Sequence, residues 1–157
     1  LSITRAYSCG GEESLQIELN VSIKPCGGCK FHNFPYEARL PVMVDGVYES
    51  RTFTCEKDVW DVIGLIIEET KEMNEKSGKD FSVSGSVKSQ LPFFACNNII
   101  YDKDLQRDIQ RYVYCDNFNT QPYPGSYGQQ PARWVQKSFI IKSEMNKATN
   151  KATKDGK

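Results

Sequence analysis

The sequence predicts an α+β fold in which a mainly antiparallel sheet packs on one long helix, with a short second helix. Three observations predict it: period-two alternation of apolar residues at 15–23, apolar positions three and four residues apart at 59–73, and no strand–helix–strand repetition. The chain has 157 residues, of which 39% are hydrophobic. This size favours one domain over residues 1–142, followed by a flexible, Lys-rich tail over residues 143–157.

The strands are predicted from alternation and from turn residues. Residues 15–23 form the clearest strand, because five apolar residues alternate there with polar ones. Residues 37–54 predict a hairpin about Asp45-Gly46, since glycine tolerates positive φ, and Pro41 places its first arm at a sheet edge. Two further strands are predicted at residues 81–87 and 134–141.

The helices are predicted from apolar stripes and from their ends. The long helix has Glu56, Asp58 and Asp61 near its start and Lys71 and Lys76 near its end, which suits the helix dipole. Ser77-Gly78 terminates it. The short helix begins after Asp102, a good capping residue, and has an apolar stripe made of Leu105, Ile109, Tyr112 and Val113.

The cysteine content predicts a redox compartment. Six cysteines in a chain of this length suggest disulfide bonds and hence a secreted protein. The chain begins at Leu1 rather than Met, as a processed protein would, and Asn20-Val21-Ser22 is a glycosylation sequon. Six cysteines allow fifteen pairings. The residues expected to form these bonds are Cys9, Cys26, Cys29, Cys55, Cys96 and Cys115.

The segment Pro25-Cys26-Gly27-Gly28-Cys29 leaves an alternative open. Two cysteines at this spacing can hold zinc in a tight knuckle, but a structural zinc needs four ligands. The others would come from His32, Cys9, Cys55, Cys96 or Cys115, and no second Cys-x-x-Cys exists. We therefore expect Cys26 and Cys29 to form bridges to two distant cysteines, with no metal and no cofactor.

Several function classes are disfavoured by composition. His32 is the only histidine, which excludes catalytic mechanisms that need two histidines and argues against an enzyme. Catalysis would require a cleft that brings His32 together with an acid such as Glu37 or Glu49. Twenty basic and twenty acidic residues balance, so nucleic acid is a disfavoured partner. No apolar run approaches the roughly 20 residues that span a membrane.

The segment between Cys115 and Trp134 is the predicted site of partner binding. It lacks periodicity, contains Pro and Gly, and concentrates the residue types of protein-binding hot spots. The candidate contact residues are Tyr123, Tyr127, Arg133 and Trp134. The alternative is that Tyr123 and Trp134 cover one end of the core.

Three short strings are similar to a known family. Tyr7-Ser8-Cys9, Asp80-Phe81-Ser82-Val83-Ser84 and Pro131-Ala132-Arg133 resemble segments of secreted fungal ribonucleases of the T1/N1 type and of their catalytically dead effector relatives. The resemblance implies that Arg133 is a relic of the catalytic arginine and that the protein acts by binding. The single histidine and the long helix after Cys55 depart from the family pattern.

The expected function is therefore that of a secreted, disulfide-stabilised, non-enzymatic binding protein of the effector kind, acting on a host or target protein. The alternative is an intracellular accessory module, viral or cellular, whose zinc knuckle at Cys26 and Cys29 supports binding of protein or single-stranded nucleic acid. The state of the thiols distinguishes the two.

Overall fold

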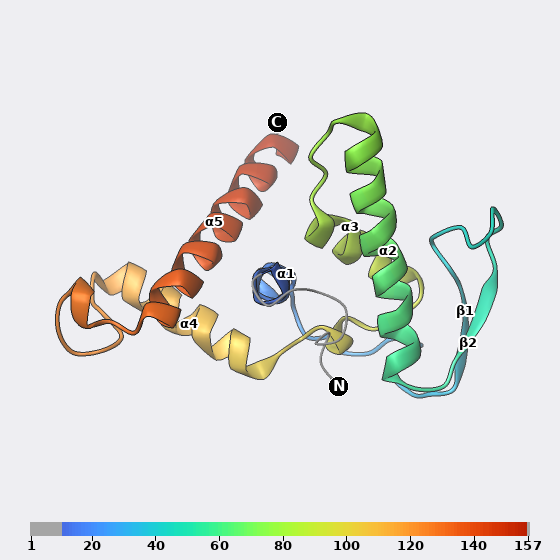
Figure 1. Cartoon of the computed structure of the whole chain (residues 1–157). Helices are drawn as coiled ribbons and strands as arrows, with labels where there is room; N and C mark the ends of the chain where they lie inside the picture. Colours follow the sequence, from blue (N-terminus) through green and yellow to red (C-terminus); the bar gives the residue numbers. More distant parts are fainter. Residues whose placement is uncertain (1–10, 157) are drawn as a thin grey trace. The chain divides into compact units, whose positions relative to one another are not determined.

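The computed structural model describes residues 11–156, and the chain divides into two compact units (Figure 1). The described part of unit 1 is Lys24–Ile100, and that of unit 2 is residues 11–23 and 101–156. The described residues form five α-helices and one two-stranded antiparallel sheet. The mixture of helix and strand is confirmed, but helices dominate and the sheet is small, in contrast to the predicted sheet-rich fold.

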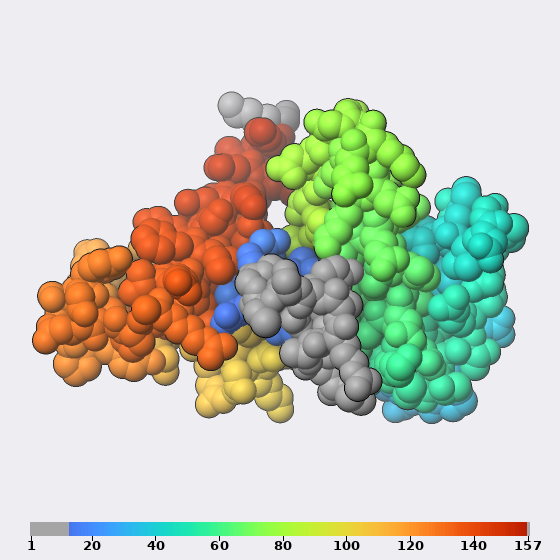
Figure 2. Space-filling model, in the orientation of Figure 1, coloured from blue at the N-terminus to red at the C-terminus, as the bar shows by residue number. Residues whose placement is uncertain are grey.

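The hairpin of unit 1 is confirmed. Strand β1 (Tyr36–Arg39) pairs antiparallel with β2 (Ser50–Phe53), with Tyr36 opposite Phe53. Beyond the strands the chain turns at Asp45 (φ 49°) and Gly46 (φ 79°), which are the positive angles that a tight hairpin turn requires. The hairpin side chains form a continuous surface with helix α2 (Figure 2, cyan to green).

Helix α2 (Glu56–Ser77) is the long helix that the apolar stripe predicts. The Asp58 carboxylate accepts hydrogen bonds from the backbone and hydroxyl of Thr54, which closes the first turn and holds the pKa of that carboxyl below its ordinary value. Gly78 ends the helix in the left-handed conformation at φ 63°. The buried face of the helix consists of Val59, Val62, Ile63, Ile66, Ile67 and Thr70.

The strand predicted at residues 81–87 is wrong, because the chain forms helix α3 (Val83–Gln90) there. The Ser82 hydroxyl accepts a hydrogen bond from the Gly85 backbone and caps the helix. Val83 and Val87 are four residues apart, so the spacing that suits a strand also places both on one helix face. Two 3₁₀ turns, η1 (Leu91–Phe93) and η2 (Asn97–Ile99), follow.

Unit 2 consists of three helices: α1 (Gly11–Asn20), α4 (Lys103–Phe118) and α5 (Ala132–Asp155), with a 3₁₀ turn η3 (Tyr127–Gln129) before α5. Helix α4 confirms the predicted short helix, and the Asp102 carboxylate accepts hydrogen bonds from the first turn of that helix as expected. The strands predicted at residues 15–23 and 134–141 are wrong, since most of the first segment lies in α1 and the second lies in α5.

The core of unit 2 explains these two errors. Ile17 and Val21 are four residues apart and Trp134 and Ile141 are seven apart, so each pair falls on one face of a helix, and all four residues are buried. The partly buried residues around Ile17, Val21 and Ile141 are Leu105, Ile109, Tyr112, Ile140 and Met145.

The boundaries predicted from the sequence stay predictions, both for a single domain over residues 1–142 and for a flexible tail over residues 143–157. Most of the residues assigned to that tail belong to α5, which extends to Asp155.

Within residues 11–156, no helix combines the length and the apolar character that a membrane-spanning segment needs.

Candidate metal centre

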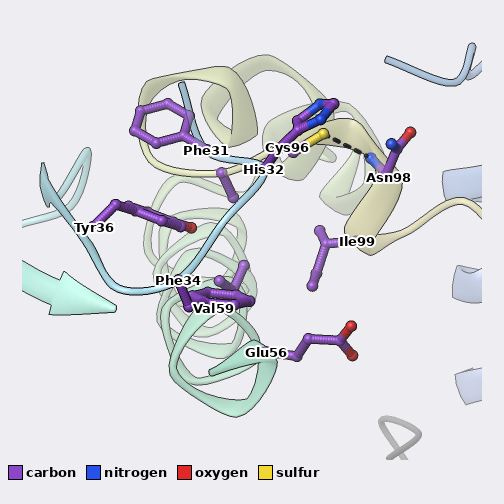
Figure 3. Close-up of a pocket in the computed structure, with 10 residues that line it drawn as sticks. Phe31, His32, Phe34, Tyr36, Glu56, Val59, Cys96, Asn98 and Ile99 are labelled. Atoms are coloured by element: carbon purple, nitrogen blue, oxygen red, sulfur yellow. Dashed lines mark hydrogen bonds between the residues drawn. The ribbon is translucent and has the colours of Figure 1, made fainter. Parts of the chain in front are cut away.

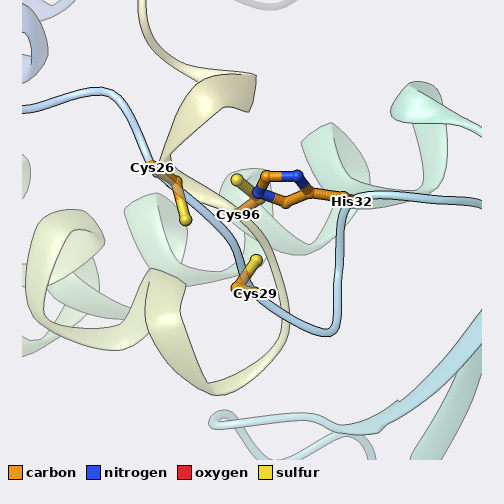
Figure 4. Close-up of side chains that lie close together, drawn as sticks. All are labelled: Cys26, Cys29, His32 and Cys96. Atoms are coloured by element: carbon orange, nitrogen blue, oxygen red, sulfur yellow. The ribbon is translucent and has the colours of Figure 1, made fainter.

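Four side chains of unit 1 converge on one point (Figure 4). Three of them, Cys26, Cys29 and His32, come from the irregular segment that precedes β1. The fourth, Cys96, lies between η1 and η2 and is buried. Figure 4 shows the three sulfur atoms and the imidazole ring directed toward one another.

The spacing of the donor atoms fits a tetrahedral ion. One ligand atom from each of the four residues lies within 4.8 Å of all the others. Zinc–sulfur and zinc–nitrogen bonds of about 2.3 and 2.0 Å place tetrahedral donors about 3.5–3.8 Å apart. The donors would therefore have to approach one another by roughly an ångström to reach the spacing of a zinc tetrahedron.

Backbone hydrogen bonds hold the two parts of the site together. The Cys26 backbone N–H donates to the Asn98 side-chain oxygen at 2.8 Å, and the Asn98 backbone N–H donates to the Cys96 sulfur at 3.4 Å. Asn98 thus links the segment that carries three candidate ligands to the turn that carries the fourth. Such outer contacts orient metal ligands and stabilise negative charge on sulfur.

The thiols of Cys26 and Cys96 have different pKa values. A hydrogen bond with the His32 side chain, aided by the Gly28 backbone, lowers the pKa of Cys26 to about 7. Burial raises the pKa of Cys96 to about 11. Because Cys26 ionises near neutral pH, it can supply the first thiolate to an incoming cation.

The donor set selects the kind of ion. Three thiols and one imidazole are soft or borderline ligands, which suit zinc and are poor ligands for magnesium or calcium. Four protein ligands complete a tetrahedron and leave no position for water or substrate, which is typical of structural rather than catalytic zinc. Cys29 and His32 are exposed, so an ion can reach the site from solvent.

The predicted disulfide stabilisation is wrong for the cysteines that the structure describes. Cys26, Cys29, Cys55, Cys96 and Cys115 are all free thiols. Cys9, the sixth expected partner, lies outside the described residues. Three of the free thiols gather around His32 instead of pairing, while Cys55 precedes α2 and Cys115 lies on α4. Disulfide stabilisation is thereby overturned for the described cysteines, whereas secretion stays a prediction.

The four residues predicted to bind a partner have different environments within unit 2. Trp134 is buried, at 9% exposure, whereas Tyr127 is 73% exposed. The Tyr123 hydroxyl accepts a hydrogen bond from Arg111, whose guanidinium also lies over the Trp134 ring. Arg133 forms an ion pair with Glu13 at 3.2 Å. Partner binding by these residues stays a prediction.

The carboxylates predicted to assist His32 do not line its pocket. Glu37 lies in β1, and Glu49 forms an ion pair with Arg51. The pocket beside His32 is instead lined by Glu56, which follows Cys55 in sequence and was not among the predicted residues (Figure 3). No local signal in the sequence marks Glu56 as a residue of a site.

Comparisons with protein-family models, with curated proteins and with solved structures find no match for this chain. The resemblance to fungal ribonucleases gains no support from them. Of the strings that suggested it, residues 7–9 lie outside the described residues, and residues 80–84 and 131–133 lie at the starts of α3 and α5. The proposed role of the site therefore depends on its own geometry.

Proposed function

We propose that the chain is a non-enzymatic binding module in which unit 1 is stabilised by one structural zinc ion held by Cys26, Cys29, His32 and Cys96. The observation that carries the proposal is the convergence of four donor atoms within 4.8 Å of one another. Zinc bound there would supply a cross-link between the segment before β1 and the turn that contains Cys96.

The local backbone supports a cross-linking role. The segment from Lys24 to Pro35 has no helix or strand, so the hydrogen-bond ladders that stabilise the rest of unit 1 are missing from this part of the described chain. The hydrogen bond from the Cys26 backbone to the Asn98 side chain joins this segment to residues 96–98. A metal ion is an effective way to fix such a segment, because it replaces many weak contacts by four strong bonds.

A protein partner is favoured over nucleic acid by two observations. The chain has no net positive charge, whereas phosphate contacts supply most of the affinity of nucleic-acid binders. Large apolar side chains are exposed on unit 2, as is common at protein-binding surfaces. The four most exposed aromatic residues of that unit are Tyr114, Phe118, Tyr127 and Phe139.

The proposal is tested by four single cysteine variants with metal analysis of each purified protein. Cys26→Ser and Cys96→Ser each remove one proposed ligand, while Cys55→Ser and Cys115→Ser are matched controls that keep all four. We expect one zinc per chain in the wild type and both controls, and a loss of bound zinc in the two ligand variants. Zinc-free wild-type protein that cannot be loaded, or equal zinc in all four variants, would contradict the proposal.

A further inference from the structure

A pocket of about 160 Å³ lies beside the metal centre in unit 1 (Figure 3). His32 and Cys96 belong to both the pocket wall and the proposed ligand set. We call this feature the aromatic pocket. The wall of the aromatic pocket also includes Phe31, Phe34, Tyr36, Glu56, Val59 and Ile99.

The size and walls of the aromatic pocket suit a single side chain. A cavity of about 150 Å³ in another protein binds benzene, so a pocket of this volume accommodates about six carbon atoms. Phe34 and Tyr36 stack at 5.4 Å between ring centroids, and Val59 and Ile99 add aliphatic surface. In Figure 3 the Tyr36 hydroxyl points toward the space between Phe34 and Ile99. An unbranched aliphatic stem fits such walls.

The polar groups of the aromatic pocket select a cation. Glu56 is exposed, and its carboxylate has no ion-pair partner among the described residues. The neighbouring ammonium of Lys57 is engaged by Asp61 at 2.8 Å and so does not neutralise Glu56. A hydroxyl oxygen on Tyr36 and a carboxylate on Glu56 are hydrogen-bond acceptors, as the N–H groups of an ammonium require.

The metal centre would add to this charge. Zinc bound by three thiolates and a neutral imidazole has a net negative charge, and two of these ligands line the pocket. One ring of the aromatic pocket already lies next to an ammonium group. The Lys30 nitrogen is 5.0 Å from the centroid of the Phe31 ring, a distance typical of a cation–π contact.

We propose that the aromatic pocket binds the alkylammonium end of a lysine side chain presented by a protein partner, an inference that rests on the proposed zinc module. The aliphatic stem contacts Phe34, Val59 and Ile99, and the ammonium pairs with Glu56. The zinc-bound segment forms the wall that contains Phe31 and His32, so ligand binding depends on the metal.

The test compares two small probes on zinc-loaded wild-type protein by backbone amide NMR. Nα-acetyl-lysine methylamide keeps the side-chain ammonium. Nα-acetyl-norleucine methylamide has the same backbone and an aliphatic side chain without the charge. We expect saturable shifts at Phe34, Glu56 and Ile99 with the lysine compound, binding at least ~5-fold weaker with the norleucine compound, and an affinity that falls as salt increases. No saturable shift, equal binding of both probes, or shifts confined to other residues would overturn the inference.

A pair of variants sharpens the test. Glu56→Gln should weaken binding of the lysine compound by at least ~5-fold, since it removes the charge and preserves the shape. Glu75→Gln, on the exposed last turns of the same helix, is the matched control and should bind like the wild type. Unchanged binding by Glu56→Gln would overturn the inference; if that variant loses zinc or helicity, the comparison of the two probes decides alone.

The two proposals fail in different ways. Metal analysis of the NMR sample shows whether zinc is bound before any probe is added. A protein that cannot be loaded with zinc contradicts the proposed function, whereas a zinc-loaded protein that ignores the lysine compound contradicts only the assignment of the aromatic pocket.

Discussion

The two units of this chain differ in their candidate metal ligands and in their buried side-chain amides. Unit 1 has a large buried core that includes Phe53, Phe94 and the apolar face of α2, yet the segment before β1 that contains three candidate ligands lacks regular structure. Unit 2 contains no comparable cluster of metal ligands among its described residues. Its helices are connected by apolar contacts and by buried side-chain amides.

The buried amide of Asn20 illustrates the difference. This residue is 3% exposed; its nitrogen donates to the Gln16 carbonyl, and its oxygen accepts from the Asp102 backbone and from Gln106. One amide thereby links the end of α1 to the start of α4. In unit 2, hydrogen bonds thus join the end of α1 to the start of α4. In unit 1, we assign to a metal ion the task of joining the segment before β1 to the turn that contains Cys96.

Removal of the metal should produce the largest difference in stability between the two units. Removal of zinc by a chelator should lower the free energy of unfolding by about 4 kcal/mol. This value applies where the free zinc concentration was about 1,000 times the dissociation constant of the site. Hydrogen exchange should accelerate at residues 24–35 and 95–99, because the cross-link between them is lost. Exchange rates in α1, α4 and α5 should change little, and mass spectrometry of peptic fragments measures both.

Zinc added back after chelation should restore the slow exchange, which serves as the control for damage by the chelator. No acceleration in either unit would show that unit 1 does not depend on a metal. Equal acceleration in both units would show that the contrast between the units is wrong.

The next effect concerns the amide of unit 2. Asn20→Ala should lower the free energy of unfolding by about 1–3 kcal/mol, because the Asp102 backbone N–H loses its acceptor and the Gln106 amide keeps only the backbone carbonyl of residue 20. Zinc content should stay at the wild-type value. Asn117→Ala, at an exposed position of α4, is the matched control for denaturant unfolding; a loss as large as that of Asn20→Ala would remove the special role of the buried amide.

The smallest effect is expected at a helix end. Asp102→Ala removes the acceptor for the N–H groups of Asp104 and Leu105 and should cost about 1 kcal/mol. Replacement by Asn, which keeps a capping oxygen, should recover most of the loss in thermal denaturation. If Asn and Ala are equally destabilising, the charge of Asp102 matters rather than its hydrogen bonds.

Local signals in the sequence sufficed for some elements and misled for others. Helices α2 and α4 were predictable because apolar stripes, acidic starts and end residues such as Gly78 and Asp102 agree with one another. The hairpin was predictable from Asp45-Gly46. Helices α1, α3 and α5 were mistaken for strands, because a period-two pattern also places residues four apart, such as Ile17 and Val21, on one helix face.

The candidate metal centre was predictable only in part. The spacing of Cys26 and Cys29 suggested a zinc knuckle, and His32 and Cys96 were among the five residues that could complete it. The choice of Cys96 over Cys55 or Cys115 depends on how the chain folds between α3 and η2, about which local patterns carry no information. The acid of the aromatic pocket, Glu56, was missed for the same reason.

We propose that three thiols and one imidazole of unit 1 bind a single metal ion, and differential alkylation distinguishes bound from free thiols. The folded protein is treated with an alkylating reagent before and after chelation, and each cysteine is quantified by peptide mass spectrometry. We predict that Cys26, Cys29 and Cys96 are protected together and become reactive together when zinc is removed, while exposed Cys55 reacts in both states. A disulfide between any two of the three, or alkylation that ignores the chelator, would contradict it.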